Sequence, residues 1–181
     1  MLLIIAVLIV KKQVDFTQSK NLGYNRKNVI TFETEGTLRL KNMNSLLTEL
    51  QNIPGVEYVS NMGGNLMGEH GGGGGVEWEG KDHRVEFAAL YVNFDLMDAL
   101  GVSMSDGRAF SRGFASDTVA VVFNETAIRQ MNLKDPIGQK VKLWGQEAKV
   151  IGIVKDFHFE SLYDNVKPFM FRFSKSGENV M

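Results

Sequence analysis

Asp156 and His158 are the two residues in this 181-residue chain whose types and spacing come closest to acid–base chemistry. A carboxylate and an imidazole can pass a proton to or from a substrate when a third group completes the site. Only Phe157 separates them on an expected strand, and no G-x-S-x-G motif supplies a serine nucleophile. We therefore expect a structural role for this tripeptide, with a hydrolase that uses Asp156 and His158 as an alternative.

The sequence has no pattern typical of a metal or nucleotide site. The chain contains no cysteine, and His70, His83 and His158 lack the i, i+4 spacing of a helical metal site. Residues 71–75 are all glycine, but no Gly-Lys-Ser/Thr sequence follows them as it would in a phosphate-binding loop. We expect no catalytic residue, no bound metal and no cofactor.

The charge balance excludes another class of function. Lys and Arg number 20 and Asp and Glu number 21, which gives a formal net charge of -1. A nucleic-acid-binding protein needs a basic surface, and this composition does not provide one. The hydrophobic share of 44% and the charged share of 23% are typical of a globular domain.

The elements that would position these residues begin with an apolar N-terminus. Residues 1–10 carry no polar side chain. A membrane-spanning helix needs about 20 such residues, so this run is about half a span. No cationic residue precedes it and no small-residue cleavage site follows it, which argues against a signal peptide. We expect residues 1–13 to be the C-terminal half of a transmembrane helix and residues 14–27 a stalk; a buried helix or strand is the alternative.

An α/β lobe follows the stalk. Residues 28–34 have the composition of a strand, and Met43, Leu46, Leu47 and Leu50 share one face of a helix that ends before Pro54. Residues 56–62 are expected to form the next strand. We assign residues 28–62 and 155–181 to this porter-like lobe, with a last strand at residues 169–173.

A β-rich lobe is expected as an insert within the α/β lobe, so the predicted fold class is α+β. Residues 63–75 hold many glycines and are predicted to form a flexible loop that leads into the insert at residues 76–154. The elements expected in the insert are a strand at 85–91, a short helix at 94–100, a strand at 119–123, a helix at 124–131, a turn at 135–138 and a hairpin about Gly145.

Several of these segments together resemble a known family. They match the pattern V-N-E-t-A … dPiGk … V-v-G-V-v-k-D-f and the segment lGi … GR-x-F of the periplasmic core domain in MacB-like, FtsX-related ABC transporter permeases. The residues that carry the resemblance are 100–102, 107–110, 121–127, 133–139 and 150–158, and residues 12–16, 22–25 and 28–30 resemble the junction after that family's first membrane helix.

The resemblance implies a non-catalytic, extracytoplasmic domain of a permease in the cell inner membrane. Such a domain responds to the motion of membrane helices and engages substrate or a periplasmic partner, while a separate ATP-binding subunit hydrolyses ATP. Lys11 and Lys12 alone favour a cytoplasmic domain, but a bias of two charges is easily overridden. Relative to the family the chain is expected to be truncated at both ends. The alternative is a soluble or lipid-tethered module of the cell envelope whose Gly71–Gly75 loop closes over a small ligand; a pocket rich in aromatic residues with convergent polar groups would favour it.

Two sets of residues are expected to matter for this function. Loop glycines and aromatic side chains are the candidates for partner contact: Gly71, Gly72, Gly73, Trp78 and Tyr91. The motif residues are interpreted as structural, with Asn124 as a helix N-cap and Gly152 at a close backbone approach or bulge. These motif residues are Asn124, Glu125, Asp135, Pro136, Gly138, Gly152 and Asp156.

Overall fold

The computed structural model describes residues 2–19, 22–25, 27–34, 43–64, 70–160, 164–175, 177 and 179–181. Its helices are α1 (Leu2–Ser19), α3 (Met43–Gln51), α4 (Leu96–Ala99), α5 (Glu125–Met131) and a 3₁₀ helix at Ala115–Val119. Its strands are β1 (Phe32–Glu33), β2 (Asn61–Gly63), β3 (Gly71–Gly73), β4 (Val76–Glu77), β5 (Phe87–Val92), β6 (Met104–Gly107), β7 (Ala120–Asn124), β8 (Lys140–Leu143), β9 (Gln146–Val154), β10 (Phe169–Phe173) and β11 (Asn179–Val180).

The described strands form one large mixed sheet, which confirms the predicted α+β class. Their order is β1-β11-β2-β5-β10-β7-β9-β8-β4, while β3 pairs with β5 and β6 pairs with β9. The central pairs β5–β10 and β7–β9 are parallel. Parallel strands are usually covered on both faces, and β7 is buried along its whole length.

Two hydrophobic cores cover the opposite faces of the central strands. Alternation along β5 sends Phe87 and Ala89 into one core and Leu90 and Val92 into the other. The first core also contains Val141 and Leu143 of β8 and the buried face of α5, and the second packs against α4. A smaller cluster under α3 joins Met43, Val59 and Val180.

The glycine run closes the central strands into a ring. Gly71–Gly73 pair with β5 as strand β3, and Val76–Glu77 pair with β8 as strand β4. Residues 71–77 therefore connect β5 to β8, the two ends of the path β5-β10-β7-β9-β8. This part of the predicted flexible loop is thus ordered strand, because the glycines allow the backbone to approach its neighbours. A Cβ atom on Gly72 would lie 1.9 Å from the carbonyl oxygen of Phe87.

The structure differs from the sequence prediction at three other strands. Strand β10 lies between β5 and β7, at the centre of the sheet, whereas the sequence assigns residues 169–173 to the α/β lobe. Its partners come from residues 87–92 and 120–124, so its position depends on long-range pairing that no local pattern reveals. The strand predicted at residues 56–62 is limited to β2, and the one at 28–34 to β1.

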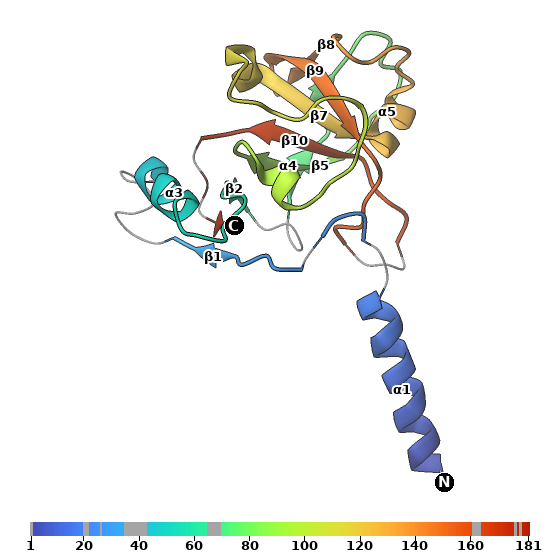
Figure 1. The fold of residues 1–181 in the computed structure, drawn as a ribbon. Coiled ribbons are helices and arrows are strands. Elements are labelled where there is room, and N and C mark those ends of the chain that lie inside the picture. Colours follow the sequence, from blue (N-terminus) through green and yellow to red (C-terminus); the bar gives the residue numbers. More distant parts are fainter. Residues whose placement is uncertain are drawn as a thin grey trace.

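The N-terminal residues form one helix that extends away from the sheet (Figure 1). Helix α1 includes residues 2–10 of the apolar run and residues 14–19 of the predicted stalk, and its described side chains are exposed, among them Ile4, Leu8 and Phe16. Within the described residues, no helix has both the length and the apolar character needed to cross a membrane.

Candidate functional site

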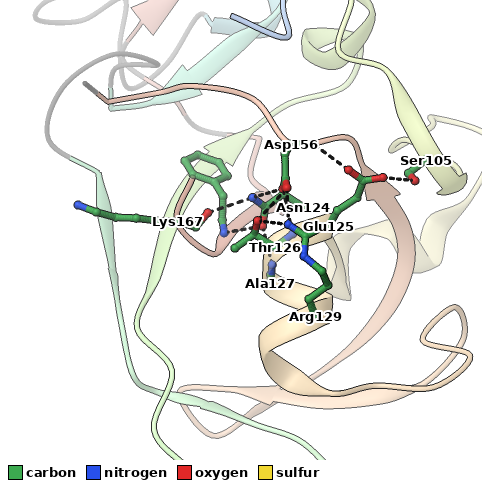
Figure 2. A network of polar contacts seen from close by, with 9 residues as sticks. Ser105, Asn124, Glu125, Thr126, Ala127, Arg129, Asp156 and Lys167 are labelled. Atoms are coloured by element: carbon green, nitrogen blue, oxygen red, sulfur yellow. Dashed lines mark hydrogen bonds and ion pairs between the residues drawn. The ribbon is translucent and has the colours of Figure 1, made fainter. Parts of the chain in front are cut away.

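Two of the motif residues, Asn124 and Glu125, meet a third, Asp156, just beyond the end of β9 (Figure 2). Its Oδ1 atom accepts hydrogen bonds from the side-chain amide of Asn124 at 3.0 Å and from the backbone N–H of Thr126 at 2.9 Å. Its Oδ2 atom accepts from the Thr126 hydroxyl at 2.8 Å and from the Arg129 guanidinium at 2.6 Å. Asp156 thus fastens the end of β9 to the first turn of α5.

Asn124 connects this cluster to β10. The residue is fully buried and is the N-cap of α5, because its Oδ1 accepts a hydrogen bond from the Ala127 backbone N–H at 2.9 Å. The same oxygen accepts from the N–H of Phe169 at 2.9 Å, and the side-chain amide donates to the carbonyl of Lys167 at 3.0 Å. One side chain therefore joins α5, β9 and β10.

Glu125 extends the cluster toward β6. Its Oε2 accepts a hydrogen bond from the backbone N–H of Asp156 at 3.3 Å, and its Oε1 accepts from the hydroxyl of Ser105 at 2.6 Å. A carboxylate in the first turn of α5 is also favoured by the helix dipole. The Asn-Glu-Thr sequence therefore has a structural role: its hydrogen bonds link α5 to β6 and to the end of β9.

Replacing Asn124 with alanine is expected to lower the free energy of unfolding by about 3 kcal/mol. Loss of the cap alone costs about 1 kcal/mol, and the buried N–H of Phe169 and carbonyl of Lys167 also lose their partner. Urea denaturation of the variant against Gln130→Ala, an exposed position on the same helix, measures the difference. A loss of only about 1 kcal/mol would mean that Asn124 contributes as a cap alone.

The segment that follows α1 is fixed to the same region. The carbonyl of Leu22 accepts a hydrogen bond from the backbone N–H of His158 at 2.8 Å, and the N–H of Asn25 donates to the carbonyl of Leu100 at 2.6 Å. Leu22 and Tyr24 are buried, and the Tyr24 ring meets Phe157 edge-on, 6.3 Å between ring centroids. We call residues 22–25 the α1 junction.

Gly23 makes the close fit of the α1 junction possible. Its φ of +89° is a left-handed conformation that favours glycine, and a Cβ atom would lie 2.7 Å from the Cβ of Phe157. The chain after α1 therefore passes directly against the residue that follows Asp156.

An open cavity of about 680 Å³ lies beside the α1 junction, and both Asp156 and His158 line it. The two oxygens of the Asp156 carboxylate are bonded to Asn124, Thr126 and Arg129, and in the described part of the chain no hydrogen bond joins Asp156 to His158. The hydrolase alternative thus lacks a paired acid and base there. The lining is mostly polar, and Tyr24 and His158 supply its aromatic rings, so it is not the pocket rich in aromatic residues that would favour the small-ligand alternative.

The other motif residues lie at turns and at a bulge. Asp135 and Gly138 have left-handed backbones on either side of Pro136, and the N–H of Gly138 donates to the carbonyl of Val150 at 2.8 Å. Gly152 lies in β9 where the register with β7 shifts, and a Cβ atom there would be 2.2 Å from the carbonyl oxygen of Arg108. These residues shape strands and do not join the Asp156 cluster.

The predicted partner-contact residues do not form one surface. Trp78 is buried, and its ring packs edge-on against Phe87 at 6.3 Å, so it belongs to the core and not to a contact surface. The reason is that residues 76–78 continue strand β4 along the closed ring, with Val76 and Trp78 facing inward. Tyr91 remains exposed, and Gly71–Gly73 are paired with β5.

Sequence reasoning missed an ion pair between Arg108 and Asp117. The guanidinium binds the fully buried carboxylate through two hydrogen bonds of 2.7 Å, and the N–H of Ser111 donates to the same carboxylate at 2.8 Å. Arg108 belongs to the motif Gly-Arg-Ala-Phe, which could have indicated a buried partner. In the portion of the chain that the structure describes, no cluster of acidic and histidine side chains could hold a metal ion.

The solved structures that share this fold include two transporter domains. They are the periplasmic region of MacB from Actinobacillus actinomycetemcomitans (TM-score 0.54, 14% identity, 83% of this chain and 71% of that one) and the extracellular domain of the noncanonic ABC-type transporter YknZ from Gram-positive bacteria (TM-score 0.55, 15% identity, 83% and 79%). These likenesses show that the chain has the same mixed α+β fold as the two domains. No curated protein matches the sequence significantly.

The sequence itself places the chain in a family. Residues 1–172 match the family described as the MacB-like periplasmic core domain, and the chain belongs to that family. The resemblance found in the motif residues is therefore confirmed. The chain is a periplasmic core domain of the kind found in MacB-like ABC transporter permeases.

Proposed function

We propose that this domain lies on the periplasmic side of the cell inner membrane and transmits movement between membrane helices and an extracytoplasmic partner or substrate, without catalysing a reaction. The observation that carries this proposal is the α1 junction, which binds the chain after α1 to the core through two backbone hydrogen bonds and the buried Leu22 and Tyr24. A movement that reaches residues 22–25 would therefore be passed directly to the core.

The contacts suggest a route for the movement. The α1 junction is bonded to His158, two residues after Asp156, and Asp156 is bonded in turn to α5. Asn124 continues the connection to β10 at the centre of the sheet. A displacement of the α1 junction would therefore act on the central strands through paired polar groups.

The remaining parts of the proposed transporter would lie outside this domain. In the proposal, ATP binds to a separate ATP-binding subunit, further permease helices complete the membrane part, and this chain needs no cofactor, metal or nucleic acid. The exposed apolar residues of α1, such as Ile4, Val7 and Leu8, suit contact with lipid or with those helices.

Spin labels on α1 and α5 test the rigid connection. We expect Lys12→Cys and Gln130→Cys, both exposed positions, to give a narrow distance distribution by electron–electron double resonance of the chain in lipid nanodiscs. Gly23→Ala should broaden it, because the methyl group collides with Phe157.

Gly55→Ala is the matched control for this experiment. Gly55 has nearly the same φ of +91°, but a Cβ atom there would meet no atom within 4 Å. The control should therefore keep the narrow distribution. A parent distribution as broad as that of Gly23→Ala would contradict the transmission of movement through the α1 junction.

A further inference from the structure

Arg172 on β10 differs from the other described arginines in its charge pairing. Arg84, Arg108, Arg112 and Arg129 each form an ion pair with a carboxylate. In the described residues, Arg172 has only neutral partners: its NH1 donates to the Tyr91 hydroxyl at 3.1 Å and its NH2 to Oε1 of Gln146 at 3.4 Å. A guanidinium carries five N–H donors, so three stay available for an anionic group.

Two exposed aromatic rings flank this guanidinium. Its central carbon lies 5.2 Å from the centroid of the Tyr91 ring and 5.5 Å from that of the Trp144 ring. Both rings are accessible, with Tyr91 39% and Trp144 45% exposed. Contact with the two π-systems holds the guanidinium in place. We call Tyr91, Trp144 and Arg172 the aromatic–arginine patch.

The position of the Trp144 ring in the patch depends on Gly75, the last residue of the glycine run. The backbone N–H of Trp144 donates to the carbonyl of Gly75 at 2.7 Å, and Trp144 begins the two-residue turn between β8 and β9 with a φ of +49°. A Cβ atom on Gly75 would lie 2.4 Å from the indole ring, so the ring can lie here only because residue 75 is glycine. The patch is therefore preorganised, which lowers the entropic cost of binding.

We propose that the aromatic–arginine patch is a docking site for an acidic segment of an extracytoplasmic partner protein. An Asp or Glu carboxylate of that segment would accept the remaining N–H donors of Arg172, since arginine pairs with carboxylates through two parallel hydrogen bonds. Tyr91 and Trp144 would contact the neighbouring apolar atoms. Trp, Tyr and Arg are the residues in which binding energy at protein interfaces is concentrated.

The inference names a partner for the proposed function and rests on it, but the test measures the surface alone. Binding of dye-labelled hexaglutamate to the purified 181-residue chain is followed by fluorescence polarisation, with dye-labelled hexalysine as the peptide control. We expect hexaglutamate to bind and hexalysine not to bind. Arg172→Gln should weaken hexaglutamate binding about tenfold, as expected for loss of a charged hydrogen-bonded pair.

Two further variants separate the patch from general electrostatic attraction. Trp144→Ala should also weaken hexaglutamate binding, whereas Arg84→Gln, which removes an exposed guanidinium already paired with Glu86, should leave it unchanged. Equal affinity in Arg172→Gln and the parent chain, equal binding of both peptides, or no binding would each overturn the inference. So would concentration-dependent dimerisation that Trp144→Ala abolishes, since it would make the patch a contact between copies. A domain found in the cytoplasm, with hexaglutamate bound as expected, would overturn the proposed function and the extracytoplasmic location of the partner, but not the binding of an acidic segment at the patch.

Discussion

Gly152→Ala is expected to lower the free energy of unfolding by about 3 kcal/mol, the upper end of the usual cost of inserting a methyl group into a packed core. The added methyl group would lie 2.2 Å from the carbonyl oxygen of Arg108 and 2.6 Å from the terminal methyl of Met104. The Met104 side chain can move away from the added methyl group. The Arg108 carbonyl is part of the backbone, so it can move only if the chain next to β6 is displaced. Chemical denaturation monitored by circular dichroism measures the loss.

Gly113→Ala is the matched control for this substitution. A Cβ atom on Gly113 would lie 3.6 Å from the Ser111 hydroxyl, which is an ordinary contact, and its φ is not left-handed. The control should keep the stability of the parent within about 0.5 kcal/mol, as most surface substitutions do. Equal losses in the two variants would show that the approach of Arg108 to β9 does not determine stability.

Asp117→Asn is expected to cost about 3 kcal/mol of unfolding free energy, because it breaks a buried ion pair and leaves the charge of Arg108 without its counterion. The Asp117 side chain is fully buried and that of Arg108 is 35% exposed. Asp95→Asn removes the same charge from the ion pair with the largely exposed Arg112 and should cost less than about 1 kcal/mol. Thermal melts of the two variants at neutral pH compare them.

The pH dependence of the Asp117→Asn effect has a definite sign. Burial raises the pKa of Asp117, but the hydrogen bonds from Arg108 and Ser111 and the charge of Arg108 outweigh burial, so the pKa lies below its usual value of 3.8. The carboxylate therefore stabilises the fold above pH 3.8, and this contribution is lost as the pH falls through the lower folded-state pKa. The difference between parent and variant should shrink in acid below that pH. If the stability difference between parent and variant did not change with pH, ionisation of Asp117 would not be coupled to folding.

Local signals in the sequence were sufficient to predict helix α5 and the hairpin formed by β8 and β9. An asparagine after a buried apolar run, with Glu125 next, predicts the start of α5, and the structure has Asn124 as its N-cap. Gly145 between two apolar runs predicts the hairpin, whose turn has left-handed backbones at Trp144 and Gly145. The cap at Asn124 and the turn at Pro136 and Gly138 could be predicted because capping and turn chemistry involve neighbouring residues.

Long-range pairing decided the features that the sequence did not predict. The glycine run becomes strand β3 only because β5 offers a partner, and glycine composition alone indicates a loop. Trp78 is buried because β4 faces the interior of the ring, and Asp117 is buried because Arg108, nine residues earlier, reaches it. The aromatic–arginine patch joins Tyr91, Trp144 and Arg172 from three strand regions, a juxtaposition that spacing along the chain cannot show.

The most direct test of the account is the side of the membrane on which the domain lies. The chain has no cysteine, so a single Gln130→Cys substitution on the exposed face of α5 gives one labelling site. Ala127→Cys, on the buried face of the same helix, is the control and should react only after denaturation. We predict that a membrane-impermeant maleimide labels Gln130→Cys in intact spheroplasts. Labelling that occurs only after the inner membrane is broken would place the domain in the cytoplasm and contradict the account.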